Sequence, residues 1–283
     1  MNGSSQAAAP APDVVCRNVR KIYGAGKGVF EAIRSVSFSV KEGEFVSILG
    51  PSGCGKSTLL LMIAGLESIT HGMIHVGGRP VAKPRTEIGI MFQDPTLLPW
   101  KSALDNVLFP IDMMRRPRRQ YHERAIELLH MVGLAGSEGR KPRQLSGGMR
   151  QRVSICRVLV SDPRVLLMDE PFSALDAITR DEMNVVLLDI WQKYRKTAVF
   201  VTHSIREAVL LSDRVLVMGG NPSTVVSDVS VPFARPRDFT LGETGEFNHL
   251  CAMLRDQIER AHVEGEETSI AASEPARSGV SHG

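Results

Sequence analysis

The 283-residue sequence has little cysteine and no long apolar run, and both absences limit what it can be. Its four cysteines are far apart and form no CxxC pair, which argues against a disulfide framework or a cysteine-based metal site. No apolar run reaches the roughly 18–20 residues that a membrane-spanning helix needs. The start, MNGSSQAAAPAPD, lacks a basic region followed by an apolar one. We therefore expect no secretory signal and a chain that stays in the cytosol.

Neither sign of charge dominates the composition. The 34 basic and 31 acidic residues leave a formal net charge of +3, which gives no reason to expect a nucleic-acid partner. With 43% hydrophobic and 23% charged residues, the chain has the composition of a soluble globular protein. Its length fits one large domain, or one domain with a smaller lobe.

The two ends differ in composition from the body of the chain. Residues 1–12 and 263–283 are rich in small and polar residues, and we expect both to be disordered tails. The ordered domain is therefore expected to span residues 13–262.

Most of this domain alternates between two patterns. Short apolar runs predict buried strands at Phe45–Leu49, Ile88–Phe92, Val165–Met168, Ala198–Val201 and Val215–Met218. Helical patterns lie between most of them, at Lys56–Leu66, Gly148–Val160, Ala177–Tyr194 and Ile205–Leu211. Strands that alternate with helices predict an α/β fold with a mainly parallel sheet and helices on both faces.

Two stretches depart from this alternation. Near the N-terminus, Val14–Ile22, Ile33–Val40 and Met73–Val76 predict an antiparallel β edge, with Gly77-Gly78 as a turn. Between Phe92 and Leu145 helical segments dominate, which predicts a helical insert at about residues 94–162.

A glycine-rich loop is the clearest motif in the chain. It follows the strand FVSIL and opens the helix KSTLLLMIAGL, which is the context that a phosphate-binding GxxxxGK[ST] loop requires. Its glycines let backbone N–H groups turn toward phosphate oxygens, and the helix N-terminus adds its dipole. We expect Lys56 to reach the β- and γ-phosphates and Ser57 to ligate Mg²⁺. The loop comprises Gly50, Pro51, Ser52, Gly53, Cys54, Gly55, Lys56, Ser57 and Thr58.

Acidic residues end another buried strand, VLLMDE at residues 165–170. Asp169 suits Mg²⁺, through a water molecule, and Glu170 could act as general base on the attacking water. Taken alone, the pair would more often be a turn-starting acid pair before a proline. The phosphate loop makes the metal interpretation the stronger one.

Two further polar residues follow predicted strands. Gln93 ends IGIMFQ, and His203 follows AVFVT. A lone histidine is more often structural than functional. However, the phosphate loop, Gln93, the 169–170 acid pair and His203 all lie at the carboxyl ends of predicted parallel strands, where ligands bind in open α/β sheets.

A second glycine-bearing helix start occurs in LSGGMRQR, residues 145–152. Ser146 can cap this helix, and Gly147 and Gly148 allow close approach of the backbone to an anion. An isolated SGG also serves as a plain helix cap. Its place shortly before VLLMDE favours a second phosphate-binding helix start in the same chain.

Together these motifs resemble the ATP-binding subunit of ABC transporters over about residues 13–230. GPSGCGKST is similar to the Walker A motif, VLLMDE to Walker B and LSGGMRQR to the ABC signature. Gln93 matches the Q-loop, Asp176 the D-loop within residues 173–176, and His203 the switch histidine. The resemblance implies catalytic roles for Gln93, Glu170 and His203, and Mg²⁺ held by Ser57, Gln93 and Asp169.

Three details of the match leave questions open. The family signature usually reads LSGGQ, and Met149 lacks the hydrogen-bonding groups of glutamine. Tyr23 stands where the family places an aromatic that stacks on adenine, but a tyrosine facing the core is an alternative. Cys54 could make the loop sensitive to thiol reagents, although a small tolerated residue is the plainer interpretation.

The resemblance also implies partners and a place in the cell. Two ATPase subunits would meet head to tail as a homodimer, with each ATP between the Walker A motif of one chain and Ser146, Gly147, Gly148 and Met149 of the other. The dimer would drive transmembrane permease subunits, and indirectly an extracytoplasmic solute-binding protein. The expected location is peripheral, at the cytoplasmic face of the inner membrane.

LLPW, the run VTHSIREAVLLSDRVLVM at residues 201–218 and the later PFARPRD resemble the nitrate/sulfonate/taurine importer branch. Trp100 is then a candidate for docking a permease, with a place in the core of the helical lobe as the alternative. The competing function is a soluble ABC ATPase acting on nucleic acid or ribosomes. That class usually has two ATPase units or a long coiled coil, neither of which this chain shows. A P-loop kinase would not explain LSGGM or His203, and the intact Lys56 and Glu170 argue against an inactive scaffold.

Overall fold

The computed structural model describes residues 12–24 and 28–273, with side chains described as far as residue 261. Most of the two predicted tails, 1–11 and 274–283, lies outside the described residues. The first strand begins at Pro12 and the last helix continues to Ser273, so these two elements extend past residues 13 and 262, the predicted limits of the domain. After His262 the sequence VEGEETSIAAS contains no proline, so nothing in it forces that helix to end.

Within the described residues, ten strands form one sheet in the order β5-β4-β1-β2-β10-β9-β3-β8-β7-β6. Their bounds are β1 Pro12–Tyr23, β2 Phe30–Lys41, β3 Phe45–Leu49, β4 His71–Val76, β5 Arg79–Pro80, β6 Ile88–Met91, β7 Val165–Asp169, β8 Thr197–Val201, β9 Arg214–Gly219 and β10 Ser223–Ser230.

The sheet has a parallel part and an antiparallel part, as predicted. Strands β9, β3, β8, β7 and β6 are parallel neighbours. Strand β1 pairs antiparallel with β2 and β4. Strand β10, which no sequence pattern predicted, joins the two parts by pairing antiparallel with β9 and parallel with β2. Its sequence, STVVSDVS, is short of large apolar residues because much of the strand is exposed.

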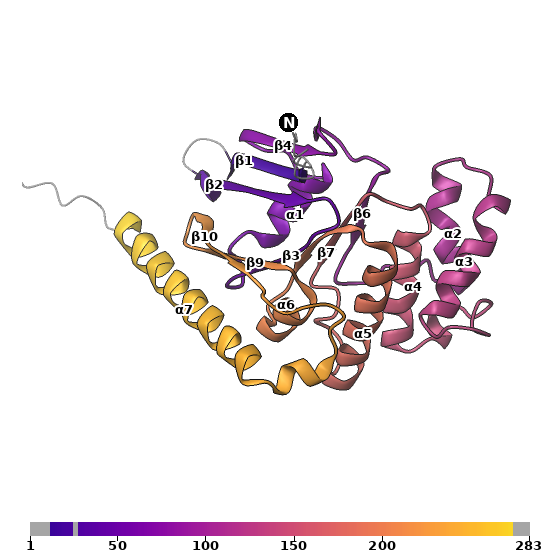
Figure 1. The fold of residues 1–283 in the computed structure, drawn as a ribbon. Helices are drawn as coiled ribbons and strands as arrows, with labels where there is room; N and C mark the ends of the chain where they lie inside the picture. Colours follow the sequence, from indigo (N-terminus) through magenta and orange to yellow (C-terminus); the bar gives the residue numbers. More distant parts are fainter. Residues whose placement is uncertain (1–11, 25–27, 274–283) are drawn as a thin grey trace, which may run out of the picture.

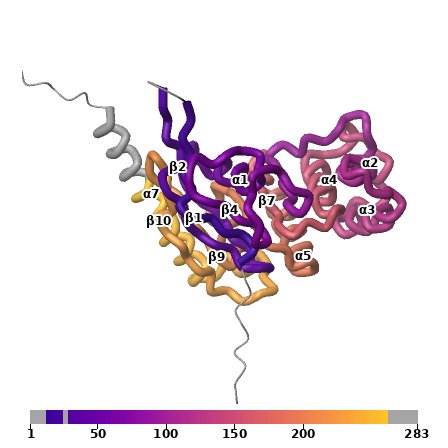
Figure 2. The backbone as a smooth tube through the Cα atoms, turned by 90° about the horizontal axis from the view of Figure 1, so that it is seen from above, coloured from indigo at the N-terminus to yellow at the C-terminus, as the bar shows by residue number. Residues whose placement is uncertain are grey.

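The helices lie on both faces of the sheet. Their bounds are α1 Lys56–Ala64, α2 Ala103–Met113, α3 Arg119–Met131, α4 Gly147–Leu159, α5 Ala177–Tyr194, α6 Ile205–Leu211 and α7 Gly245–Ser273, with 3-10 turns at Pro142–Gln144 and Phe239–Glu243. In Figures 1 and 2, α1 lies between the β1–β2–β4 region and the central strands, and α2, α3 and α4 gather in a lobe at one side. This lobe contains the predicted helical segment at residues 119–132.

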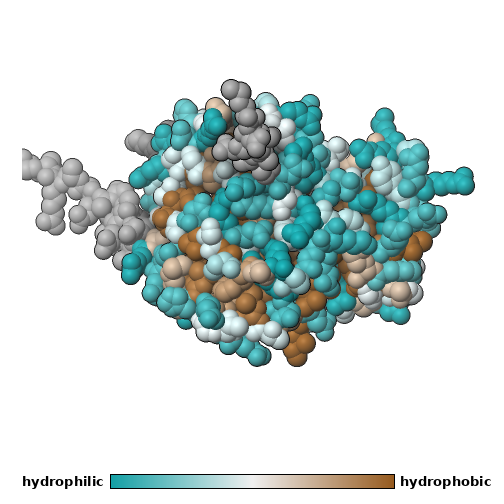
Figure 3. Space-filling view, viewed as in Figure 1, coloured by the Kyte–Doolittle hydropathy of each residue, from teal (hydrophilic) through white to brown (hydrophobic). Residues whose placement is uncertain are grey.

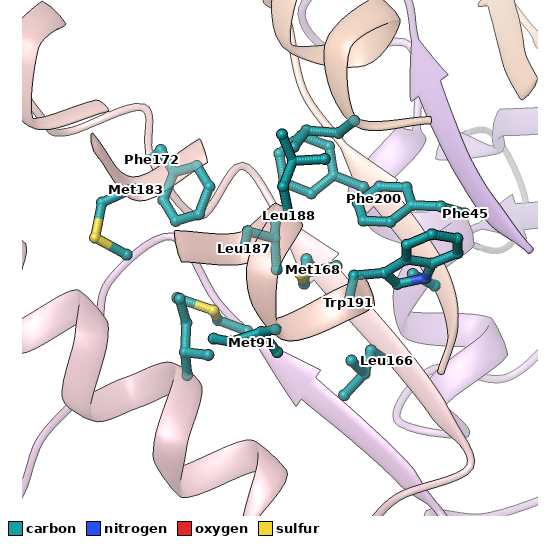
Figure 4. Packing of buried hydrophobic residues seen from close by; sticks show 14 of the residues in the cluster. Phe45, Met91, Leu166, Met168, Phe172, Met183, Leu187, Leu188, Trp191 and Phe200 are labelled. Carbon is teal, nitrogen blue, oxygen red and sulfur yellow. The ribbon is translucent and has the colours of Figure 1, made fainter. Parts of the chain in front are cut away.

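Alternate residues of the central strands face two separate cores. Val46 and Ile48 of β3 pack with α1 and the N-terminal strands, whereas Phe45 and Leu49 pack with the helices of the other face. The second core contains an aromatic group in which the ring of Phe45 lies 6.0 Å from Trp191 and 5.9 Å from Phe200 (Figure 4). Each fully buried large apolar side chain contributes about 1.5–3 kcal/mol, so these strands are held from both faces.

The surface of the molecule is mostly polar on the face shown in Figure 3, where hydrophobic residues form separate patches. None of the helices in the described part of the chain has the length and apolar character needed to cross a membrane.

Candidate functional site

The glycine-rich loop leads from the fully buried strand β3 into α1. Gly55, the residue before the helix, has φ 87°, a left-handed conformation that favours glycine. Lys56 is buried with 5% of its surface exposed, and its Nζ donates to the carbonyl oxygens of Gly50 at 2.9 Å and Pro51 at 2.7 Å. A cation held by neutral carbonyls inside a loop of N–H groups is suited to an anionic ligand.

Ser57 and Asp169, two of the predicted metal ligands, lie side by side. The Ser57 Oγ donates to Asp169 Oδ1 at 2.9 Å, which joins the first turn of α1 to the end of β7. Burial raises the pKa of the Asp169 carboxyl, and the nearby Glu170 carboxylate raises it further. A hydroxyl and a carboxylate oxygen are hard donors of the kind that Mg²⁺ prefers, so this pair fits the expected ion.

Glu170 and His203 are brought together from neighbouring strands. The Nδ1 of His203 lies 3.1 Å from Glu170 Oε2, at the ends of β8 and β7. Glu170 has φ 44°, an uncommon conformation for a residue with a side chain. Its backbone is held because its N–H donates to the carbonyl of Val201 at 2.9 Å and its carbonyl accepts from Ser173 Oγ, also at 2.9 Å. A carboxylate fixed beside an imidazole can take up a proton from a bound water.

Gln93 follows β6, the strand at the edge of the sheet next to β7. Its exposed side chain lines a cavity of about 680 Å³ together with Asp169 and Gly147. The backbone at this point is fixed by Gln151, a buried residue of α4 whose Nε2 donates to the carbonyls of Gln93, at 3.0 Å, and of Pro171. No sequence motif pointed to Gln151, although its polar side chain falls among the buried positions of α4.

The second glycine-bearing helix start also has the predicted cap. The Ser146 Oγ accepts from the backbone N–H of Met149 at 3.2 Å. Gly148 packs so closely on α5 that a Cβ there would lie 2.6 Å from Thr179 Cγ2. The Met149 side chain is half-buried against the core, which accounts for an apolar residue at this position.

Asp176, the D-loop residue, caps α5. Its carboxylate accepts from the Thr179 N–H at 3.0 Å and the Thr179 Oγ1 at 2.8 Å, and these hydrogen bonds lower the pKa of Asp176. Because Thr179 also contacts Gly148, the starts of α5 and α4 are held against each other.

The structure also bears on three open alternatives. Tyr23 is 37% exposed, with Lys21 Nζ 4.6 Å from its ring centre, so it does not face the core. Cys54 is buried, and burial raises the pKa of its thiol, which disfavours the reactive thiolate. Trp100 is 68% exposed and therefore not part of the core of the helical lobe.

Apart from Tyr23 and Asp176, the predicted residues form two groups. The loop at 50–58 and residues Gln93, Asp169, Glu170 and His203 lie at the carboxyl ends of β3, β6, β7 and β8, which are neighbours in the sheet. Residues 146–149 begin α4 in the helical lobe (Figure 1). Among the described residues, no hydrogen bond joins 145–149 to the loop at 50–58. The second group is therefore not bonded to the loop at 50–58 of its own chain, and Ser146 is exposed at the surface.

Comparison with known proteins agrees with this geometry. The family described as ABC transporter matches residues 33–173. The chain is 45% identical over 224 residues to the bicarbonate transport ATP-binding protein CmpD of Synechocystis sp., covering 78% of this chain and 79% of that protein. It is 45% identical over 219 residues to the taurine import ATP-binding protein TauB of Burkholderia pseudomallei, covering 77% and 84%. A solved dimer of an ATP-binding cassette, in a post-hydrolysis state bound to ADP and Pi, has a TM-score of 0.67 at 33% identity and covers 78% of this chain and 100% of that chain. The expected fold and the resemblance to the importer branch are confirmed.

Proposed function

This chain belongs to the ABC transporter family and is an ATPase, and on that basis we propose that it energises the import of a small solute by binding and hydrolysing ATP. The solute belongs to the class of nitrate, sulfonates, taurine and similar small solutes. The names of the taurine and bicarbonate relatives support this class. The observation that carries the proposal is the presence of two glycine-bearing helix starts, of which only the first is bonded, among the described residues, to the end of another strand.

ATP would bind along residues 50–58, with its adenine on the exposed ring of Tyr23. Lys56 would exchange its carbonyl partners for phosphate oxygens. Mg²⁺ would be held by Ser57, Asp169 and Gln93, and when bound it supplies positive charge beside the phosphates.

Glu170 is the proposed general base. Its Oε2 accepts the proton of the attacking water, while the His203 imidazole orients and stabilises the carboxylate through the 3.1 Å contact. The rest of the rate enhancement would come from positioning, because the fold holds the reacting groups in place.

Two copies would meet head to tail, so that Ser146, Gly147, Gly148 and Met149 of one chain complete the ATP site of the other. The exposure of Ser146 and the dimeric state of the similar solved cassette support this arrangement. We propose that residues 13–262 form one ATPase domain, with its helical insert at about residues 94–162.

The proposed partners are transmembrane permease subunits, with a solute-binding protein acting indirectly from outside the membrane. The exposed Trp100 is the proposed contact with the permease at the cytoplasmic face. Solute choice would rest with those subunits, because the site described here binds nucleotide.

The test is a pull-down of tagged protein from detergent-solubilised membranes of the native host, followed by mass spectrometry. We expect a multi-span permease, and we expect Trp100→Ala to reduce its recovery while ATP binding stays unchanged. A Phe239→Ala variant, which changes an aromatic side chain that is 39% exposed elsewhere on the surface, is the matched control. Recovery of ribosomal proteins or nucleic acid alone would overturn the transport function and favour the soluble ABC ATPase.

A further inference from the structure

Glu207 is an acidic residue in a buried place. It lies in the first turn of α6, with only 7% of its surface exposed, and burial raises the pKa of its carboxyl. A buried carboxylate is tolerated when it is paired and hydrogen-bonded. Here the Oε2 of Glu207 accepts from Thr202 Oγ1 at 2.6 Å, and its Oε1 lies 3.8 Å from the Nε of Arg180.

The Thr202 side of this contact holds the loop that carries His203. Thr202 Oγ1 also accepts from the backbone N–H of Ser204 at 3.0 Å. The Glu207 N–H in turn donates to Ser204 Oγ at 3.3 Å. The residues immediately before and after His203 are therefore both fixed to the first turn of α6.

The Arg180 side holds the loop that carries Glu170. Arg180 belongs to α5, and its Nη2 donates to the carbonyl of Leu175 at 2.9 Å and to that of Ser173 at 3.4 Å. Ser173 is bonded to the Glu170 carbonyl through its Oγ. One guanidinium thus closes the loop from Glu170 to Asp176 and presents its Nε to Glu207.

The two loops begin at adjacent parallel strands, so the sheet sets where they start. Beyond the sheet, the Arg180–Glu207 pair is a charge-complementary link between them, in addition to the direct contact of His203 with Glu170. We propose that Arg180 and Glu207 are positioning residues that set the geometry of His203 against Glu170. This inference rests on the catalytic roles proposed above for those two residues.

The kinetic test uses the full-length chain with Glu207→Gln, Arg180→Met and the double variant. Each single change should lower kcat for ATP hydrolysis by about 10- to 100-fold, because small displacements of reacting groups cost that much, and should leave KM for ATP nearly unchanged. The kcat of the double variant should fall by less than the product of the two single effects, since both changes remove the same Arg180–Glu207 contact. Arg180→Lys should recover part of the rate.

The matched control is an ion pair elsewhere, Arg124 with Asp162 at 2.9 Å. Arg124→Met and Asp162→Asn should keep the wild-type kcat. If the Arg180 and Glu207 effects multiply, or if Glu207→Gln hydrolyses at the wild-type rate, the positioning role is overturned.

A second readout does not depend on activity. Backbone hydrogen exchange at residues 170–176 should become faster in Glu207→Gln, although the changed residue is on another helix. It should not change in Asp162→Asn. Thr202→Val, which removes both hydrogen bonds of the Thr202 hydroxyl, serves the same purpose if Glu207→Gln folds poorly. Unchanged exchange in both would overturn the link.

The two proposals fail in different ways. Normal hydrolysis by Lys56→Ala and Glu170→Gln would contradict the proposed site itself. Normal hydrolysis by Glu207→Gln beside an inactive Glu170→Gln would overturn only the positioning role.

Discussion

Helices α1 and α4 both begin at glycine-bearing loops, but their first turns are held differently. In α1, Lys56 is buried against its own loop and Ser57 is bonded to Asp169 of a distant strand. In α4, Ser146 is exposed and bonds only to the backbone of its own helix. The first turn of α1 is thus bonded to other parts of the same chain, whereas the first turn of α4 is capped by its own Ser146 and lies at the surface.

The glycines of the two starts also serve different needs. Gly55 supplies a left-handed backbone, with φ 87°, at the entry to α1. Gly148 is needed for space, because a Cβ would collide with Thr179 of α5. Glycine at a helix start can thus be required for conformation in one place and for packing in another.

The largest expected effect is on the α1 start. Lys56→Ala should weaken nucleotide binding and abolish turnover, because no other described cation lies within the loop. Isothermal titration and phosphate release would measure the two effects. Wild-type ATPase in this variant would contradict the role of the loop.

The next largest effect concerns both helix starts, that of α1 in one chain and that of α4 in its partner. Glu170→Gln should lower hydrolysis by roughly 10²–10⁴-fold while ATP binding is retained, since it removes the proposed base. ATP that is bound but not hydrolysed should also contact the N-terminus of α4 from a partner chain. The variant should therefore form a dimer in the presence of ATP, which light scattering would detect. A variant that stays monomeric at saturating ATP would count against the shared site.

A smaller effect should follow Gly148→Ala. The added methyl group meets a stiff β-branched side chain, so we expect a loss of about 1–3 kcal/mol in the free energy of unfolding. Thr179→Ser removes the colliding methyl and should restore stability. Gly139→Ala, where a Cβ meets no atom within 4 Å, is the control. Equal losses in both glycine variants would show that the contact is unimportant.

The smallest effect should come from the cap of α4. Ser146→Ala removes the acceptor of the Met149 N–H and should cost about 1 kcal/mol in urea unfolding. Ser146→Asp keeps an acceptor and should retain this stability. If it also lowers ATP-driven dimerisation, the added negative charge is acting against a partner's phosphates.

Much of the fold and the site could be predicted from local signals. Strand Phe45–Leu49 is a buried run of five residues, and helices Ala177–Tyr194 and Ile205–Leu211 begin directly after the capping side chains Asp176 and Ser204. Walker-type motifs place their residues at strand ends, so their gathering at one edge followed from the parallel sheet. These features depend on residues close together in the chain, and the sequence alone was sufficient for them.

Other features depend on which segments meet in space. Strand β10 has a weak pattern of its own and exists because β9 and β2 flank it. The exposure of Tyr23 depends on how the strands around it pack. The hydrogen bond from Gln151 to Gln93 and the contact of Arg180 with Glu207 each join segments that are far apart in the sequence. Burial and electrostatic pairing depend on distance in the folded chain rather than along it, so only the tertiary structure could decide them.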